Sequence, residues 1–292
     1  MPLTIIGGKE VKEQSRLNKI LSLVAAAVPM PSASPSLVPT DPATSQRLLD
    51  QHHVVIDALG GKLVLAPINL TQPNLRILDS ATADGHWLQE LREQCGSSKN
   101  NTYVGTDINS KILPTSFPPD FDFYLHNFGT AWPSKAHASF DLAHQRLSLP
   151  GAVPYSLPQA VRNILELVKP GGWIQLVEAE QIAPNSGPVF LEFLELVREL
   201  EESGAVDIQE ISVDMILGPS NEKIELVEKG ASSTAGAMHG LVMHAKAMNL
   251  RTSLSNIQLD TLADRLYAEL IETGAHYPLR AVWGRKKPVG DA

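Results

Sequence analysis

The stretch that decides the fold is RILDSATADGHW, residues 76–87. Its first four residues are typical of a buried strand, and the small residues after them are typical of a tight turn into a helix that begins near Gly85. In open α/β sheets, the loop after the first strand lies at the edge where ligands bind. Ala81 and Ala83 stand where cofactor loops usually carry glycine. The stretch therefore predicts a cofactor loop in which two glycines are replaced by alanine.

The spacing of the small residues favours S-adenosylmethionine (SAM) over NAD. The dinucleotide pattern G-x-G-x-x-G, aligned on Ala81 and Ala83, places the bulky His86 where a small residue should let the helix pack on the strand. The pattern acid-x-G-x-G-x-G aligns on Asp79, Ala81, Ala83 and Gly85, and replaces glycine only by the smallest side chain. Alanine is expected to lose access to positive φ while adding little bulk. A strand–turn–helix without a ligand remains the alternative.

A second acid strengthens the cofactor interpretation. TYVGTD, residues 102–107, reads as the next strand and ends in Asp107. This residue follows Gly85 by 22 positions, near the roughly 20 expected for an acid that binds ribose hydroxyls.

The rest of the chain alternates strands with helices up to about residue 180, which predicts a parallel, doubly wound α/β sheet. A helix begins at Asp41–Pro42 and ends at Gly60–Gly61, and another is capped by Ser156. Further strands are expected over 121–127, 138–144, 173–180 and 279–287, and further helices over 9–28, 189–203, 235–249 and 257–273.

Four segments are expected. They are an N-terminal helical extension with a Pro/Ser linker (1–40), a Rossmann-like core that binds the cofactor (41–184), a helical cap or substrate region with a further core strand (185–275), and a C-terminal strand with a tail (276–292).

Composition limits the partners. The chain has 292 residues, 43% of them hydrophobic, and a formal net charge of −8, so nucleic acid and anionic membranes are not expected partners. The lone Cys95 excludes an intrachain disulfide and favours a reducing, cytoplasmic setting. The apolar run Ile20–Val28 is too short to cross a bilayer, although a signal-peptide core is an alternative. No metal site is expected, because no cysteine cluster or H-x-x-x-H spacing occurs.

The chain resembles the fungal LaeA-like class I SAM-dependent methyltransferases, which include many enzymes of secondary metabolism. The resemblance runs from about Gln46 to Lys287. It is carried by the segments QRLLDQHHVVIDALGGKLVLAPI (46–68), RILDSATADGHW (76–87), GTDIN (105–109), FGTAWP (128–133), FDLAHQRL (140–147), LVKPGGWIQLVEAE (167–180) and HYPLRAVWGRKK (276–287).

The resemblance implies a Rossmann-like class I methyltransferase sheet with an N-terminal helical arm and a helical cap. It also implies a role for each matching residue. Asp79, Ser80, Ala81, Ala83 and Gly85 hold the methionine half of SAM, Asp107 binds the ribose, and Ile108, Asn127 and Phe128 lie near the adenine, while His144 and Gln145 lie on the loop after the fourth strand beside the methyl group.

Methyl transfer needs a base only when the acceptor atom must lose a proton to react. The candidate bases are His144, Glu178, His52 and His53. The expected reaction moves the SAM methyl group to oxygen, nitrogen or sulfur of a small, largely apolar metabolite. The alternatives are a SAM-bound cyclase or dehydratase of the same fold and a regulatory protein that binds partners. The N-terminal helix is a possible homodimer contact.

Overall fold

The computed structural model describes residues 42–96, 100–149, 155–179, 200–247 and 254–290. The helix predicted over 9–28 and most of that predicted over 189–203 lie outside these residues.

A seven-stranded sheet forms the centre of the fold and confirms the predicted Rossmann-like architecture. The strands run in the order β3-β2-β1-β4-β5-β7-β6. The first five are parallel, and β7 is antiparallel to both β5 and β6. Because β1 lies between β2 and β4, the strand order reverses beside it, which is where such sheets bind ligands. The strands are β1 (Arg76–Ser80), β2 (Thr102–Asp107), β3 (Phe121–Leu125), β4 (Phe140–Arg146), β5 (Val168–Ala179), β6 (Ala205–Leu217) and β7 (Ala275–Lys286).

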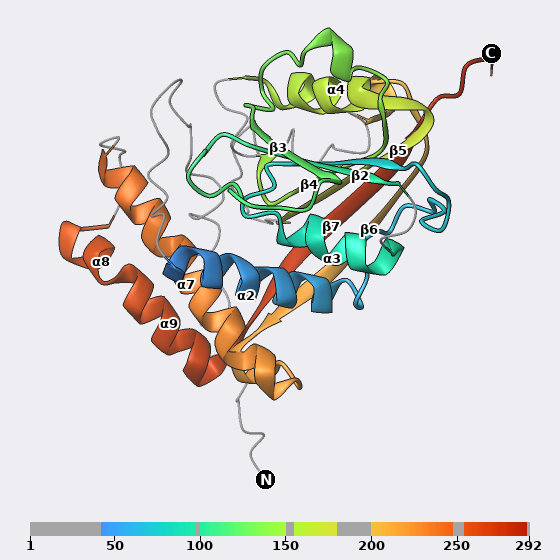
Figure 1. Ribbon diagram of the computed structural model, residues 1–292. Coiled ribbons are helices and arrows are strands. Elements are labelled where there is room, and N and C mark those ends of the chain that lie inside the picture. Colours follow the sequence, from blue (N-terminus) through green and yellow to red (C-terminus); the bar gives the residue numbers. More distant parts are fainter. Residues whose placement is uncertain (1–41, 97–99, 150–154, 180–199, 248–253, 291–292) are drawn as a thin grey trace.

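Helices cover both faces of the sheet (Figure 1). One face carries α2 (Pro42–Ala58) and α3 (His86–Cys95), and the other carries α4 (Leu157–Leu167), which the Ser156 side chain caps by accepting from the Gln159 N–H. The long helix α7 (Ile224–Ala247) packs against α2, and α9 (Leu262–Thr273) packs against α7. Shorter helices are α8 (Asn256–Asp260), η1 (Ser134–Ala136) and η3 (Gly218–Ser220).

Each face of the sheet buries its own apolar core, because neighbouring residues of a strand point to opposite faces. In β1, Ile77 packs with Trp87 and Leu88 of α3, whereas Leu78 packs with Ile164 of α4. All five of these side chains are at most 3% exposed. The parallel strands are therefore covered on both faces, and four of the five residues of β1 are buried.

The structure corrects the predicted position of His144 and Gln145. They lie inside β4, not on the loop after it, because pairing continues to the strand end: Gln145 is level with Ser80 of β1, and Arg146 is level with Val177 of β5. Both side chains are at most 2% exposed.

Other boundaries also move. The strand predicted over 173–180 begins at Val168, since the turn-like KPGG segment continues the strand through a bulge opposite β4. The helix predicted over 235–249 begins at Ile224, where packing on α2 outweighs its glycine and serine content. The helix predicted over 257–273 is two helices that meet at Thr261.

The edge strand β6 lies within the segment 185–275, where a further core strand is expected at an unspecified position. It pairs with β7 along almost its whole length, from Ala205 opposite Lys286 to Leu217 opposite Ala275. Within the described residues, no helix is long and apolar enough to cross a membrane.

Candidate active site

Four neighbouring strands end at one edge of the sheet. Ser80, Asp107, Arg146 and Ala179 are the last residues of β1, β2, β4 and β5. Because these strands are parallel, the loops that follow them gather on this carboxyl edge, beside the point where the strand order reverses. The predicted cofactor residues therefore come together here.

The loop after β1 has a left-handed backbone at alternate positions. The φ angle is 57° at Ala81, 54° at Ala83 and 79° at Gly85. This corrects the expectation that alanine loses positive φ: both alanines adopt it, at a cost of about 1–2 kcal/mol each. The Thr82 N–H donates to the Thr106 carbonyl at 2.8 Å, and the Gly85 N–H to the Thr82 carbonyl at 3.1 Å. These bonds hold the loop in the shape that glycines would adopt freely.

Asp79, in β1, connects this loop to β4. One carboxylate oxygen accepts from the Thr82 hydroxyl at 2.7 Å, and the other lies 2.7 Å from Nδ1 of His144. Asp79 is 4% exposed. A carboxylate that makes two short hydrogen bonds fixes its partners rather than moving between them.

His144 joins the sheet to α3. Its ring lies parallel to the indole of Trp87, with centroids 3.8 Å apart and an interplanar angle of 5°. The Trp87 Nε1–H donates to the Leu63 carbonyl at 3.3 Å. Burial lowers the pKa of His144, although its bond to Asp79 acts in the opposite direction. His144 is therefore held on two sides within the core.

Asp107 presents an oriented carboxylate at the end of β2. Its oxygens accept from the Ala83 N–H at 3.0 Å and the Asn109 N–H at 2.9 Å. A carboxylate offers about four acceptor positions, so about two remain for the hydroxyls of a ribose. Burial raises the pKa of Asp107, while the backbone donors oppose that rise. The neighbouring Ile108 is 44% exposed, as an apolar surface for a purine would be.

The small residues of this region leave space that Phe123 of β3 covers. A Cβ atom built on Gly105 would lie 2.4 Å from the Phe123 ring, and one on Gly85 would lie 2.8 Å from it. Gly85 also has φ of 79°, where side chains are strained. Gly85 and Gly105 thus let the Phe123 ring lie close to the backbone. The left-handed loop after β1 and the ribose-type acid Asp107 are the features that fit SAM.

Three other predicted contact residues have different surroundings. The Ser80 hydroxyl is fully buried and has no hydrogen-bond partner among the described residues. Asn127 accepts the Gly129 N–H on its side-chain oxygen at 3.0 Å. Phe128 is 9% exposed and packs in the core beneath α4. Contact between these residues and a cofactor stays a prediction.

His52 and His53 of α2 reach the same region but have separate partners. His52 lies between Glu90, at 2.6 Å from Nε2, and Arg146, at 3.2 Å from Nδ1. Burial and the Arg146 charge lower the pKa of His52 to about 3. His53 lies 3.0 Å from the Lys229 ammonium group of α7, and burial followed by this charge lowers its pKa as well.

Glu178 lies near the end of β5 and holds the chain that follows β4. Its Oε1 accepts the N–H groups of Ser148 and Leu149, both at 2.9 Å. Glu178 is 1% exposed, and burial raises its pKa to about 8. A carboxyl group with this pKa is mostly protonated near neutral pH.

Comparison with known proteins settles the family. A family described as "Methyltransferase domain" matches residues 51–201, more than half of the chain. The chain belongs to the methyltransferase family. It is a LaeA-like class I methyltransferase that uses SAM and acts on small metabolites.

The relatives are fungal. This methyltransferase is 32% identical to methyltransferase psoC of Aspergillus fumigatus over 79% of its own chain and 89% of psoC. It is 29% identical to N-methyltransferase gliN of the same species, over 82% of its own chain and 93% of gliN. It is 44% identical to N-methyltransferase sirN of Leptosphaeria maculans over 49% of each chain.

Sequence reasoning missed Gln175 of β5, which fastens the segment after α2 to the methyltransferase sheet. Its amide oxygen accepts the Leu65 N–H at 2.6 Å and the Ala66 N–H at 3.2 Å, and its amide nitrogen donates to the Leu63 carbonyl at 3.0 Å. Asp79, His144 and Gln175 are level with one another on adjacent strands. The available signal was a polar residue inside the apolar run WIQLV, since buried amides need partners.

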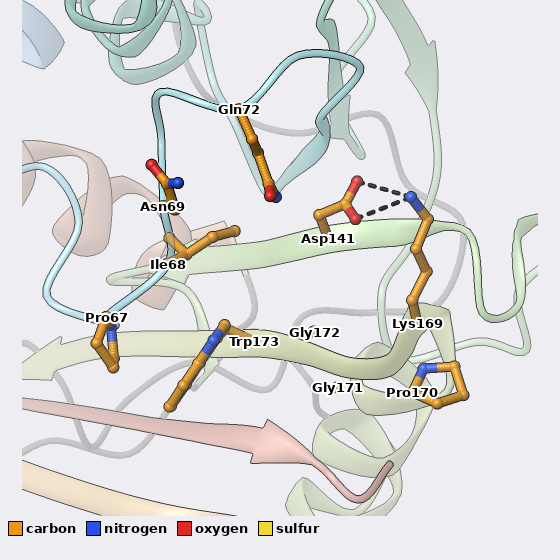
Figure 2. Close-up of a pocket in the computed structure, with 10 residues that line it drawn as sticks. All are labelled: Pro67, Ile68, Asn69, Gln72, Asp141, Lys169, Pro170, Gly171, Gly172 and Trp173. Atoms are coloured by element: carbon orange, nitrogen blue, oxygen red, sulfur yellow. Dashed lines mark hydrogen bonds and ion pairs between the residues drawn. The ribbon is translucent and has the colours of Figure 1, made fainter. Parts of the chain in front are cut away.

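A separate hollow lies at the opposite edge of the methyltransferase sheet, near the start of β4 and β5. Its volume is about 230 Å³, and its lining includes Asn69, Gln72 and Trp173 (Figure 2). Lys169 Nζ closes one side with bonds of 2.9 and 2.7 Å to the two Asp141 oxygens. This hollow is therefore separate from the edge of the sheet where the cofactor residues lie. Among the described residues, no group of three His, Cys, Asp or Glu side chains could hold a metal ion.

Proposed function

We propose that this methyltransferase transfers the SAM methyl group to a nitrogen atom of a small, largely apolar metabolite, at the carboxyl edge between β1 and β4. The observation that carries the proposal is the left-handed backbone at Ala81, Ala83 and Gly85, which keeps the shape of a glycine loop although alanine replaces two of its three glycines. The names of the relatives gliN and sirN, both N-methyltransferases, favour nitrogen over oxygen or sulfur.

The cofactor contacts follow from this edge. The loop from Asp79 to Gly85 would hold the methionine half of SAM, the remaining acceptor positions of Asp107 would bind the ribose hydroxyls, and Ile108 would cover the adenine. When bound, SAM supplies a methyl group on a sulfonium that is already a good leaving group. The protein then contributes mainly position, which can supply a large part of the rate.

A side-chain base is not part of the proposal. His144, His52 and His53 each have a partner that fixes one or both ring nitrogens, and Glu178 accepts two backbone N–H groups. These contacts favour positioning roles, and catalysis by any of the four stays a prediction. An uncharged acceptor nitrogen attacks with its own lone pair and loses its proton afterwards.

The proposal extends to the surroundings of the reaction. Residues 185–275 would cap the core (41–184), and residues 1–40 would contact a second copy of the chain. The net charge of −8 disfavours nucleic acid and anionic membranes as partners. The lone Cys95, which is buried in the core, favours a cytoplasmic setting.

The test uses SAM with a trideuterated methyl group and a panel of small apolar amines, amides, phenols and thiols. Mass spectrometry then follows transfer by the full chain. The proposal expects labelled methyl on nitrogen acceptors, and little transfer by the Asp107→Asn variant. Transfer only to oxygen or sulfur would overturn the choice of acceptor atom. A new unlabelled product with SAM unchanged would instead indicate a cyclase or dehydratase.

A further inference from the structure

Arg146 is the last residue of β4 and lies beside the start of the cofactor loop. Gln145 is level with Ser80, the last residue of β1, so Arg146 is level with the position that follows, Ala81. Side chains alternate between the faces of a strand, so Arg146 shares with His144 the face that α2 and α3 cover. Its guanidinium is thereby placed next to the loop proposed to hold the methionine half of SAM.

The contacts of His52 fix its tautomer. An arginine can only donate, so Nδ1 of His52 accepts from Nη2 of Arg146 at 3.2 Å. The hydrogen of the neutral ring is then on Nε2, which donates to Glu90 at 2.6 Å. His52 is 2% exposed. A neutral imidazole thus connects the Glu90 carboxylate to the Arg146 guanidinium and orients it without adding charge.

One nitrogen of the Arg146 guanidinium makes no hydrogen bond within the described residues. Nη1 of Arg146 is buried and has no hydrogen-bond partner in the described part of the chain. Leaving a charged N–H without an acceptor in a buried place is costly, so a native protein usually supplies the acceptor itself or leaves it to a ligand. The acidic groups that interact with Arg146 at longer range are Asp79, Asp84, Glu90 and Glu178. None of these carboxylates accepts from Nη1.

We propose that Nη1 of Arg146 donates to the α-carboxylate of the methionine half of SAM, and that His52 and Glu90 position it for this contact. The inference rests on the proposed cofactor site. A carboxylate is the acceptor that a guanidinium binds best. SAM carries its carboxylate at the end remote from the adenine, which is the end proposed to lie beside β1 and β4. Arg146 would then hold the carboxylate of the cofactor, and Asp107 would hold its ribose.

The test compares two ligands by calorimetric titration of the full chain. S-adenosylhomocysteine carries the amino-acid carboxylate, whereas 5′-methylthioadenosine keeps the adenosine and the thioether but lacks the amino-acid half. Arg146→Met should weaken S-adenosylhomocysteine about 10- to 100-fold, and should change 5′-methylthioadenosine less than about twofold. Unchanged binding of the second ligand also shows that the variant is folded.

Two further variants separate a ligand contact from a structural role. Arg146→Lys keeps the charge and should recover part of the lost affinity. His52→Ala frees the guanidinium and should weaken S-adenosylhomocysteine by a smaller factor, again without changing 5′-methylthioadenosine. Arg162→Met, on α4 across the sheet, is the matched control and should change neither ligand.

The outcomes distinguish this inference from the proposed function. If the unaltered protein binds neither ligand, the cofactor site itself is wrong. If it binds both and Arg146→Met weakens both equally, or neither, then Arg146 does not contact the carboxylate. If Arg146→Met fails to fold, equal losses for both ligands in His52→Ala overturn the inference, whereas a loss confined to S-adenosylhomocysteine supports it.

Discussion

The imidazole of His144 lies flat against the indole of Trp87, with ring centroids 3.8 Å apart. Because His144 also lies 2.7 Å from Asp79, it links β4, α3 and β1 beneath the cofactor loop. The sequence alone suggests His144 as a catalytic base. Its contacts instead indicate a structural role in supporting the cofactor loop.

Replacing His144 should destabilise the fold. His144→Ala removes a buried ring and leaves Asp79 without its donor, so the free energy of unfolding should fall by about 2–4 kcal/mol. Urea unfolding measures it. The control is His276→Ala, whose side chain on β7 is 53% exposed and should matter by less than about 0.5 kcal/mol. Equal effects of the two substitutions would contradict the central position of His144.

Replacing an alanine of the cofactor loop by glycine should increase the stability of the protein. Ala83→Gly relieves a left-handed alanine, worth about 1–2 kcal/mol, and adds a backbone entropy cost of about 0.5–1 kcal/mol. The protein should therefore become more stable by up to about 1.5 kcal/mol. Ala231→Gly, at a fully buried position in the middle of α7, should lose about 1 kcal/mol or more. Thermal unfolding of both variants tests this, and a loss at both sites would show that Ala83 is not strained.

Asp107 should contribute to the affinity for the adenosine half of the cofactor. Asp107→Asn replaces one acceptor oxygen by a donor that faces the N–H groups of Ala83 and Asn109. Affinity for S-adenosylhomocysteine and 5′-methylthioadenosine should fall together, by about tenfold or more. Calorimetry measures both, with Asp122→Asn at an exposed position of β3 as the control. A loss confined to one ligand would mean that Asp107 does not bind the ribose.

Glu178 should make stability depend on pH. Burial raises its folded pKa from 4.5 to about 8, so between these values the folded state binds more protons than the unfolded state. The resulting stabilisation is present below pH 4.5 and is lost as the pH rises through about 8.

Glu178→Gln isolates this effect. The glutamine oxygen can still accept the Ser148 and Leu149 N–H groups, but it carries no charge. The variant should match the unaltered protein near pH 5 and exceed its stability by up to a few kcal/mol near pH 8. Denaturant unfolding at the two pH values measures the difference. Parallel pH profiles for both proteins would show that Glu178 ionises normally.

The sheet was largely predictable because its parallel strands are short apolar runs separated by turn residues. The sequence indicated a further core strand within 185–275 but not the position of β6, although AVDIQEISVDMIL alternates apolar and polar residues along much of its length. The strand lies at the sheet edge with many partly exposed residues, and its charged positions resemble a helix surface. The strand period of two was the signal that could have found it.

Only those parts of the candidate site that are close together in the sequence were predictable. The residue types and spacing of Asp79, Gly85 and Asp107 identify a cofactor loop. By contrast, His52 contacts Glu90, 38 positions away in the sequence, and Arg146, 94 positions away. No local sequence pattern connects these three residues. Likewise, the left-handed alanines depend on Asp107 and Thr106 from the next strand. Such contacts arise from tertiary packing, which spacing does not encode.

The central claim is that the loop with Ala81 and Ala83 is a working SAM site. The most direct test is a calorimetric titration of the full chain with SAM, S-adenosylhomocysteine and NAD in parallel. The structure predicts micromolar binding of SAM and S-adenosylhomocysteine and no binding of NAD. Failure of both SAM and S-adenosylhomocysteine to bind would contradict it, and would mean that the loop keeps its shape without holding a cofactor.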